Sequence, residues 1–188
     1  MEEEEILENA RENLLRPGID NRELCELIWR VEPLREEAAK KLMEQRPSND
    51  DLLFILDLVP SLREKAWRNF VRQQPSNAQL SLVMKNIPPL RERAAKKLLE
   101  KNPTNDDLEY IIIMIPSLRR QAWEKLLDKR PTNKNLLEVI ENVPLLRSEA
   151  WQEFLEQDDP NIDEVAYIIK RFPSLKNQLR EAQEKKRK

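Results

Sequence analysis

The chain has 188 residues, with 33 lysines and arginines against 35 aspartates and glutamates, so its formal net charge is only −2. This near-neutrality provides no global field that would attract nucleic acid or an anionic membrane. One cysteine and no histidine exclude an internal disulfide, metal sites built from cysteine or histidine clusters, and Ser-His-Asp or Cys-His catalysis.

The composition favours helices. Gly18 is the only glycine, which leaves little for hairpin turns or phosphate-binding loops, while Leu, Glu, Lys, Arg and Ala dominate. The acidic start Met1-Glu2-Glu3-Glu4-Glu5 is the opposite of a basic signal peptide, and the apolar stretch 110–116 is too short to span a bilayer. We therefore expect a soluble protein of a reducing compartment such as the cytoplasm, with no membrane partner.

Residues 3–16 predict one helix ahead of the first full repeat, because Ile6, Ala10, Leu14 and Leu15 follow the apolar spacing of a helix. From there on, prolines divide the chain. Two series run in step at an interval of 28 residues, with the last member of each one residue late: Pro47, Pro75, Pro103, Pro131, Pro160 and Pro60, Pro88, Pro116, Pro144, Pro173. Since proline ends one helix and can open the next, each repeat should contain two helices, which we call helix A and helix B.

The first helix of each repeat, helix A, has a recurring start signal. A capping residue is followed three positions later by a residue that can cap in return: Asp20/Glu23, Ser48/Asp51, Ser76/Gln79, Thr104/Asp107, Thr132/Asn135 and Asn161/Glu164. Counted from the cap, positions +4, +7, +8 and +11 are apolar, as in Leu108, Ile111, Ile112 and Ile115, and form one helical face.

The second helix, helix B, reads Pro-Ser-Leu-Arg-x-x-Ala-Trp-x-x-Leu-Leu in its clearest copy, residues 116–127. Its Leu, Ala and Leu or Phe positions lie on one stripe. The period, together with the Leu-Arg-x-x-Ala motif at Leu62-Arg63, Leu90-Arg91, Leu118-Arg119 and Leu146-Arg147, resembles short HEAT-like repeats. The resemblance covers nearly the whole chain and concerns the superfold, which does not fix function.

These patterns predict an all-α fold: an α-solenoid of antiparallel helix pairs with about six and a half repeats, in which stacked neighbours bury what one pair cannot. We treat residues 1–188 as one domain. Its predicted parts are the half-repeat 3–16, the repeats 20–47, 48–75, 76–103, 104–131, 132–160 and 161–184, and a charged tail 185–188.

Two sets of helix B residues have structural interpretations. Trp67, Trp123 and Trp151 share one repeat position beside the apolar stripe, so we expect them in the seam between adjacent repeats. An early cation recurs at Arg35, Arg63, Arg91, Arg119, Arg147 and Lys176. A helix N-terminus disfavours cations, so each of these side chains needs a compensating partner. We expect the Asn and Asp side chains of adjacent caps, such as Asn49, Asn77 and Asn105, to supply it and to form a polar ladder between repeats. The alternative for these cations is phosphate or carboxylate binding.

The outward face of helix A is the candidate binding site. Positions +6 and +9 point away from the core stripe, yet they hold large apolar side chains: Trp29, Phe54, Leu82, Tyr110, Ile113 and Tyr167. We call these six residues the helix A ridge. Glu26 and Glu138 interrupt it at position +6. A contiguous exposed apolar ridge marks an interaction site, although flanking helices or a dimer contact could also cover it.

The leading functional hypothesis is a non-catalytic scaffold that binds a protein or peptide, or a second copy of itself, along its stacked helices. One alternative is a HEAT-like DNA-repair glycosylase or other nucleic-acid binder, against which the glutamates interleaved among the lysines argue. Another is an engineered repeat scaffold without a natural partner. The irregular Cys25, the insertion at Gly18-Ile19 and the extra residue at Asp158-Asp159 favour a natural sequence that has diverged instead. Paired carboxylates such as Asp50-Asp51 serve as dipole partners, so we expect no catalytic residue, cofactor, metal or small-molecule substrate.

Overall fold

In the computed structural model, the backbone is described for residues 2–157 and 161–186, and the side chains for residues 4–157 and 161–181. These residues form thirteen α-helices and five short 3-10 helices, and no strand occurs among them. The all-α repeat fold with a 28-residue period is therefore confirmed. Pro160, the doublet Asp158-Asp159 and the tail residues 187–188 lie outside the described part.

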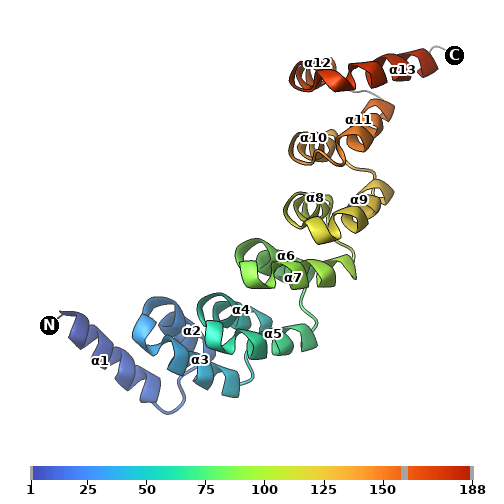
Figure 1. The fold of residues 1–188 in the computed structure, drawn as a ribbon. Helices are drawn as coiled ribbons and strands as arrows, with labels where there is room; N and C mark the ends of the chain where they lie inside the picture. The colour runs from blue at the N-terminus through green and yellow to red at the C-terminus, as the bar shows by residue number, and fades with distance from the viewer. Residues whose placement is uncertain (1, 158–160, 187–188) are drawn as a thin grey trace. The chain divides into compact units, whose positions relative to one another are not determined.

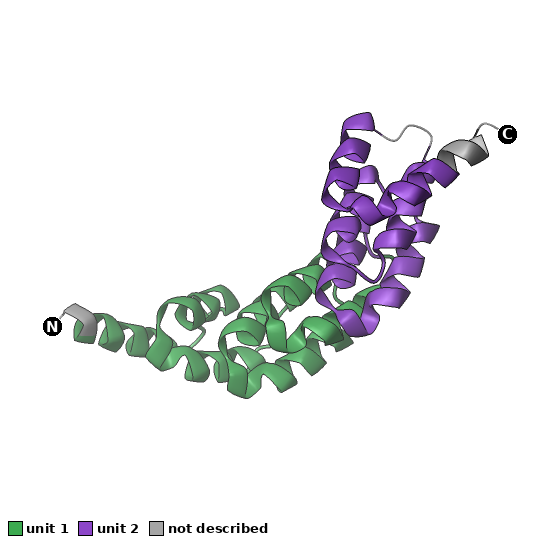
Figure 2. Ribbon diagram, turned by 45° about the horizontal axis from the view of Figure 1, so that its top comes forward, with its two compact units in different colours: residues 1–102 green, residues 103–188 purple. Residues whose placement is uncertain are grey.

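The chain divides into two compact units, residues 1–102 and residues 103–188, and the division falls one residue before the predicted end of the repeat 76–103 (Figure 2). That residues 1–188 act as one domain stays a prediction. The first unit contains α1 (Glu2–Leu15), α2 (Asn21–Arg30), α3 (Arg35–Glu44), α4 (Asn49–Leu58), α5 (Arg63–Arg72), α6 (Asn77–Asn86) and α7 (Arg91–Leu99). The second contains α8 (Asn105–Met114), α9 (Arg119–Asp128), α10 (Asn133–Asn142), α11 (Arg147–Glu156), α12 (Ile162–Arg171) and α13 (Lys176–Lys186).

Within each unit the helices alternate between two layers, A and B (Figure 1). Every even-numbered helix is a helix A, and the first five of them pack on the helix B that follows, as α4 does on α5 and α8 on α9. Successive helices A also contact one another, α2 with α4 and α4 with α6 in the first unit, and α8 with α10 in the second. The predicted +4, +7, +8 and +11 positions are buried in the repeats 48–75 and 104–131. Apolar surface is thus shared between neighbours, as a repeat array requires.

Helix α1 only partly fits its prediction as a half-repeat. Ala10 and Leu14 are buried, but Ile6 and Leu15 are 60% and 73% exposed. A helix B in a full repeat has its own helix A beside it, whereas α1 packs on α2 and has no helix A of its own in the described chain. The apolar spacing of residues 3–16 therefore overstates how much of this helix is buried.

Capping boxes begin five of the six helices A. Both reciprocal hydrogen bonds are present at α2, α4, α6, α8 and α10. The sixth prediction is wrong, because the Asn161 side chain accepts from the backbone N–H of Asp163, one residue earlier than Glu164. Asn is short and prefers such local turns, so it satisfies the nearer donor.

The best-satisfied cap gives a testable prediction. Thr104 Oγ1 accepts from Asp107 N at 3.1 Å and donates to the nearly buried Asp107 carboxylate at 2.8 Å. We expect Thr104→Ala to lower the free energy of unfolding by about 1–2 kcal/mol, since it removes the cap and leaves a buried carboxylate short of a donor. Equilibrium urea unfolding followed by circular dichroism measures the change. Ser117→Ala, at an exposed serine of the 3-10 turn Pro116–Leu118, is the control; equal effects of the two substitutions would contradict the prediction.

The connection from helix A to helix B explains the second proline series. In four of the six repeats the proline opens a 3-10 turn that ends at the helix B leucine: Pro60–Leu62, Pro88–Leu90, Pro116–Leu118 and Pro173–Leu175. In the first repeat the turn is Glu32–Leu34, with proline at its second residue. Helix B then begins at the next residue, the recurring arginine or lysine. Proline suits this place because it has no N–H to leave unsatisfied.

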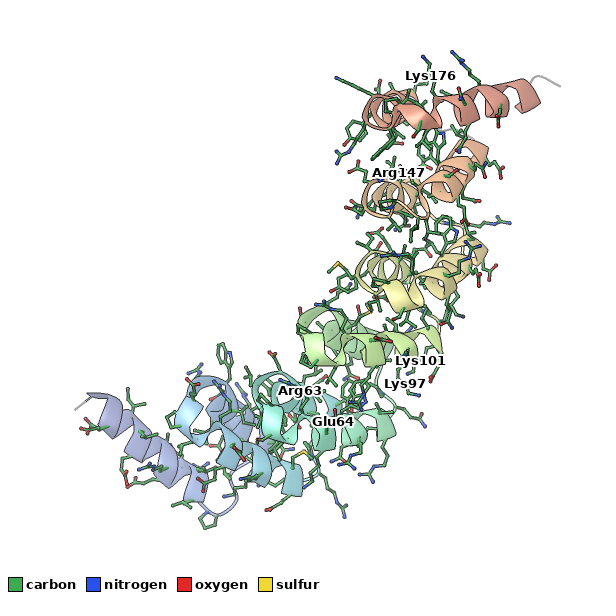
Figure 3. All side chains as sticks on the ribbon, in the orientation of Figure 1. Arg63, Glu64, Lys97, Lys101, Arg147 and Lys176 are labelled. Carbon is green, nitrogen blue, oxygen red and sulfur yellow. The ribbon has the colours of Figure 1, made fainter. Side chains whose placement is uncertain are left out.

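The recurring arginine has a different partner from the predicted one. Its Nε donates to the carbonyl oxygen seven residues earlier, near the end of helix A: Arg35 to Ile28 at 2.8 Å, Arg63 to Leu56 at 2.7 Å, Arg91 to Met84 at 3.2 Å, Arg119 to Ile112 at 2.7 Å and Arg147 to Ile140 at 2.7 Å. Arg63, Arg147 and the exposed Lys176 are labelled in Figure 3. Lys176 makes no such bond within the described chain. The guanidinium satisfies an orphan carbonyl at the negative end of the helix A dipole, which compensates for its place at the start of helix B.

Two of the cap asparagines do form hydrogen bonds, but each bonds to a loop carbonyl at the end of its own repeat rather than to an arginine or to another repeat. Asn77 Nδ2 donates to the Asn102 carbonyl at 2.7 Å, and Asn105 Nδ2 to the Arg130 carbonyl at 3.5 Å. A second set of hydrogen bonds, which the sequence did not suggest, links a repeat to the end of the preceding one. Residues just after helix B donate to the loop carbonyl 26 residues earlier, as Gln73 does to Pro47 at 2.9 Å and Gln157 to Pro131 at 3.0 Å.

The single glycine occupies a recurring backbone position. Gly18 has φ +80°, and the residues 28, 56 and 112 positions later, Arg46, Gln74 and Arg130, have φ of 55°, 52° and 56°. The chain thus turns through the left-handed region after helix B in these repeats, where only glycine is free of strain. Gly18 is aligned with the repeats, so reading Gly18-Ile19 as an insertion is wrong.

Candidate functional site

The helix A ridge lies on the outward face of the A layer in both units. In the first unit its members are well exposed: Trp29 on α2 by 60%, Phe54 on α4 by 38% and Leu82 on α6 by 49%. In the second unit Tyr110 and Ile113 on α8 are half-buried, whereas Tyr167 on α12 is 46% exposed. The three seam tryptophans behave in the opposite way, since Trp67, Trp123 and Trp151 are at most 5% exposed.

In the first unit the ridge residues border two separate hollows between neighbouring helices A. The hollow between α2 and α4 has a volume of about 280 Å³ and contains both aromatic residues, Trp29 and Phe54; its full lining is Arg22, Cys25, Glu26, Trp29, Asp50, Asp51 and Phe54. We call it the Trp29–Phe54 hollow. The hollow between α4 and α6 has about 210 Å³ and is lined by Leu53, Asp57, Leu82, Asn86 and Ile87. Helix packing thus converts a row of single side chains into recesses that could seat side chains of a partner.

The Trp29–Phe54 hollow has a tightly held acidic wall. Asp51 caps α4 through Ser48 and also accepts from Asn21 Nδ2 at 3.2 Å. Asp50 accepts from Gln79 Nε2 at 2.6 Å, and Glu26 faces Arg22 at 3.8 Å. At the floor, the Cys25 thiol has its pKa raised to about 12, first by burial and then by the charge of Asp51 and a hydrogen bond to it. Cys25 is therefore a neutral, unreactive thiol at physiological pH.

In the second unit the same face is also acidic. Glu109 of α8 accepts from Asn135 Nδ2 at 2.6 Å. Burial raises the pKa of Glu109, the hydrogen bond from Asn135 opposes that rise, and the charges of Glu138 and Asp106 add to it. Tyr167 accepts a hydrogen bond from Arg171 at 2.8 Å. Glu138, the predicted interruption of the ridge, thus contributes negative potential at Glu109 of α8.

Sequence reasoning missed several exposed apolar residues. Met114 is 46% exposed on α8, four residues after Tyr110, so the helical wheel could have placed it beside the ridge. Leu145 and Ile162 are exposed by 81% and 82% next to helix starts, where no periodic signal exists. Among the described residues, no group of three His, Cys, Asp or Glu side chains is arranged to hold a metal ion. None of the helices in the described ranges is both long and apolar enough to cross a membrane.

Repeated helix pairs with a fixed period, shared apolar faces and recurring caps define this chain as a helical repeat protein. No protein-family model matches the sequence, and neither a curated protein nor a solved structure matches it.

Proposed function

We propose that this protein is a non-catalytic, HEAT-like scaffold of the cytoplasm that binds a protein or peptide partner, or a second copy of itself, through the outward face of its helices A. The observation that carries the proposal is the exposure of large apolar side chains in register on that face, with Trp29, Phe54 and Leu82 bordering hollows between adjacent helices. Large apolar groups gathered on a surface typically mark an interaction site, and Trp is the residue most enriched at binding hot spots.

The packing of the core supports this assignment indirectly. Trp67, Trp123 and Trp151 fill the seams between repeats, so the fold has a structural use for its other tryptophans. Trp29 does not fill a seam between repeats. Among the aromatic and cation–π contacts of the described residues, its ring has one partner, the exposed guanidinium of Arg30 at 5.5 Å. An exposed tryptophan in a recess is a ready anchor for a partner.

A second candidate function is nucleic-acid binding, for which one hollow gives specific support. On α5, Lys65, Arg68, Asn69 and Arg72 line a recess of about 300 Å³ without any acidic residue. Glu64, which precedes Lys65 on α5 and is labelled in Figure 3, pairs with Arg93 of α7. Three cations on one helix neutralise few phosphates, and the buried seam tryptophans could not stack on a base. A gel shift with duplex DNA at low and high salt tests this alternative.

The proposed function predicts that charge on the ridge destroys binding without unfolding the protein. We expect Phe54→Glu with Leu82→Glu to abolish capture of the partner in a pull-down, or self-association in light scattering. Because both side chains are exposed, the thermal midpoint should shift by no more than about 2–4 °C.

The matched control is Lys40→Glu with Lys96→Glu on the exposed face of helices B, where each lysine pairs with a glutamate four residues earlier. This control should change the association rate and its salt dependence at most. Partners retained by the ridge variant but lost by the control would place the site on helices B and favour the electrostatic alternative.

A further inference from the structure

The Trp29–Phe54 hollow combines two features that both favour a cationic ligand. One is a pair of exposed aromatic rings contributed by neighbouring helices, Trp29 from α2 and Phe54 from α4. The other is an excess of carboxylates, since Glu26, Asp50 and Asp51 outnumber the single cation Arg22 in the lining. Aromatic faces carry negative quadrupole charge, so rings and carboxylates attract the same kind of ligand group, an organic cation.

Two groups of the hollow, the Cys25 thiol and the Trp29 ring, already respond to nearby charges. The Cys25 thiol resists ionisation partly because of the Asp51 charge, which shows that the recess disfavours added negative charge. The Trp29 ring already has a guanidinium over it, that of its exposed neighbour Arg30. Because this contact is local and exposed, it is weak, and an incoming cation that also reaches the carboxylates would replace it.

We propose that the Trp29–Phe54 hollow binds a cationic side chain, arginine or lysine, of the partner peptide. The inference rests on the proposed function, and it names the chemistry of the partner: a segment that carries both basic and apolar residues. A basic residue contacts the aromatic rings and faces Glu26 and Asp50, and an apolar residue of the same segment enters the next hollow, lined by Leu53 and Leu82. Arginine fits better than lysine because its planar guanidinium stacks on rings and pairs with carboxylates.

The A face of the second unit, taken by itself, is also acidic, which supports a basic partner. There Glu109, which directly precedes the α8 ridge residue Tyr110, lies within the field of Glu138 and Asp106, with Lys134 as an opposing charge. The raised pKa of Glu109 arises in part from the charges of Asp106 and Glu138, so carboxylates are crowded on this face too. A neutral or acidic partner would leave the repulsion among these carboxylates in place, whereas a basic partner would reduce it.

The test uses the full chain and two synthetic peptides. The probe is acetyl-Leu-Arg-Leu-Arg-Leu-amide, and its counterpart carries citrulline in place of both arginines, which keeps the shape but removes the charge. Binding is followed by the NMR shift of the Trp29 indole N–H, assigned with Trp29→Phe. We expect the arginine peptide to bind at least tenfold more tightly than the citrulline peptide.

Three variants separate the contributions. Glu26→Gln with Asp50→Asn should weaken the arginine peptide at least fivefold and leave the citrulline peptide unchanged. Trp29→Leu keeps an apolar group but removes the aromatic face, so it should also weaken the arginine peptide selectively. Glu36→Gln, at an exposed glutamate of α3 that pairs with Lys40, is the matched control and should change neither affinity.

Two results would overturn the inference. Equal affinity for the two peptides would mean that the hollow selects apolar shape, and absence of any Trp29 shift would mean that it binds neither peptide. In both cases the proposed function survives if Phe54→Glu with Leu82→Glu still loses its partner. Conversely, the arginine peptide could bind selectively while the variant Phe54→Glu with Leu82→Glu still captures the partner. That result would retain the cation site and reject the proposed function.

Discussion

Replacing Trp123 by alanine is expected to lower the free energy of unfolding by about 3–5 kcal/mol, the usual cost of truncating a buried aromatic residue. Trp123 is 1% exposed on α9, and its indole N–H donates to Glu149 of α11 at 3.2 Å. The substitution therefore leaves a cavity in the seam between two repeats and removes a hydrogen bond to a charged acceptor. Because each repeat touches only its neighbours, the loss should be felt mainly in the second unit.

Equilibrium urea unfolding, followed by circular dichroism, measures this effect. Trp29→Ala is the matched control, since Trp29 is a tryptophan of the same chain that is 60% exposed. We expect the control to change stability by less than about 1 kcal/mol, as surface substitutions do. A near-neutral Trp123→Ala, or a control with the larger effect, would reverse the assignment of seam and surface tryptophans.

Arg119→Ala is expected to lower the free energy of unfolding by about 1.5–3 kcal/mol, the range for hydrogen bonds made by charged groups. The half-buried Arg119 donates through Nε to the Ile112 carbonyl at 2.7 Å and through a terminal nitrogen to the Ile113 carbonyl at 3.4 Å. Alanine leaves these carbonyls at the end of α8 without the donor. Arg119→Lys should restore only part of the loss, because a single ammonium cannot reproduce the fork.

The neighbouring Arg120 provides the control for this prediction. It is exposed and pairs with Glu124 at 3.1 Å and with Glu149 at 2.8 Å, so its replacement by alanine should cost no more than about 1 kcal/mol. Urea midpoints of the three variants, compared with the parent protein, decide the matter. If Arg120→Ala were the more damaging of the two alanine variants, the surface ion pairs rather than the Arg119 bonds would join the helices.

Features that depend on neighbours in sequence were predictable. The cap Ser48/Asp51 spans three residues, and the stripe Leu52, Ile55, Leu56 lies on one helical turn and the next, so helix geometry alone fixes them. Recurrence every 28 residues then predicts the repeat fold, because a stripe that recurs must find the same partner each time. The burial of Trp123 and the exposure of Trp29 follow from the same helical wheel, because Trp123 lies beside the apolar stripe of helix B and Trp29 lies opposite the apolar stripe of helix A.

Features that depend on contacts between helices required the tertiary structure. The sequence singled out Arg119 as needing a partner, but its length and flexibility permit several, and only the angle between α8 and α9 brings the Ile112 carbonyl within reach. Likewise, Trp29 and Phe54 were predicted to be on one face, yet their shared hollow with Glu26 and Asp50 exists only because α2 and α4 pack side by side. Periodicity specifies the direction in which a side chain points; the packing of neighbouring helices decides which groups it meets.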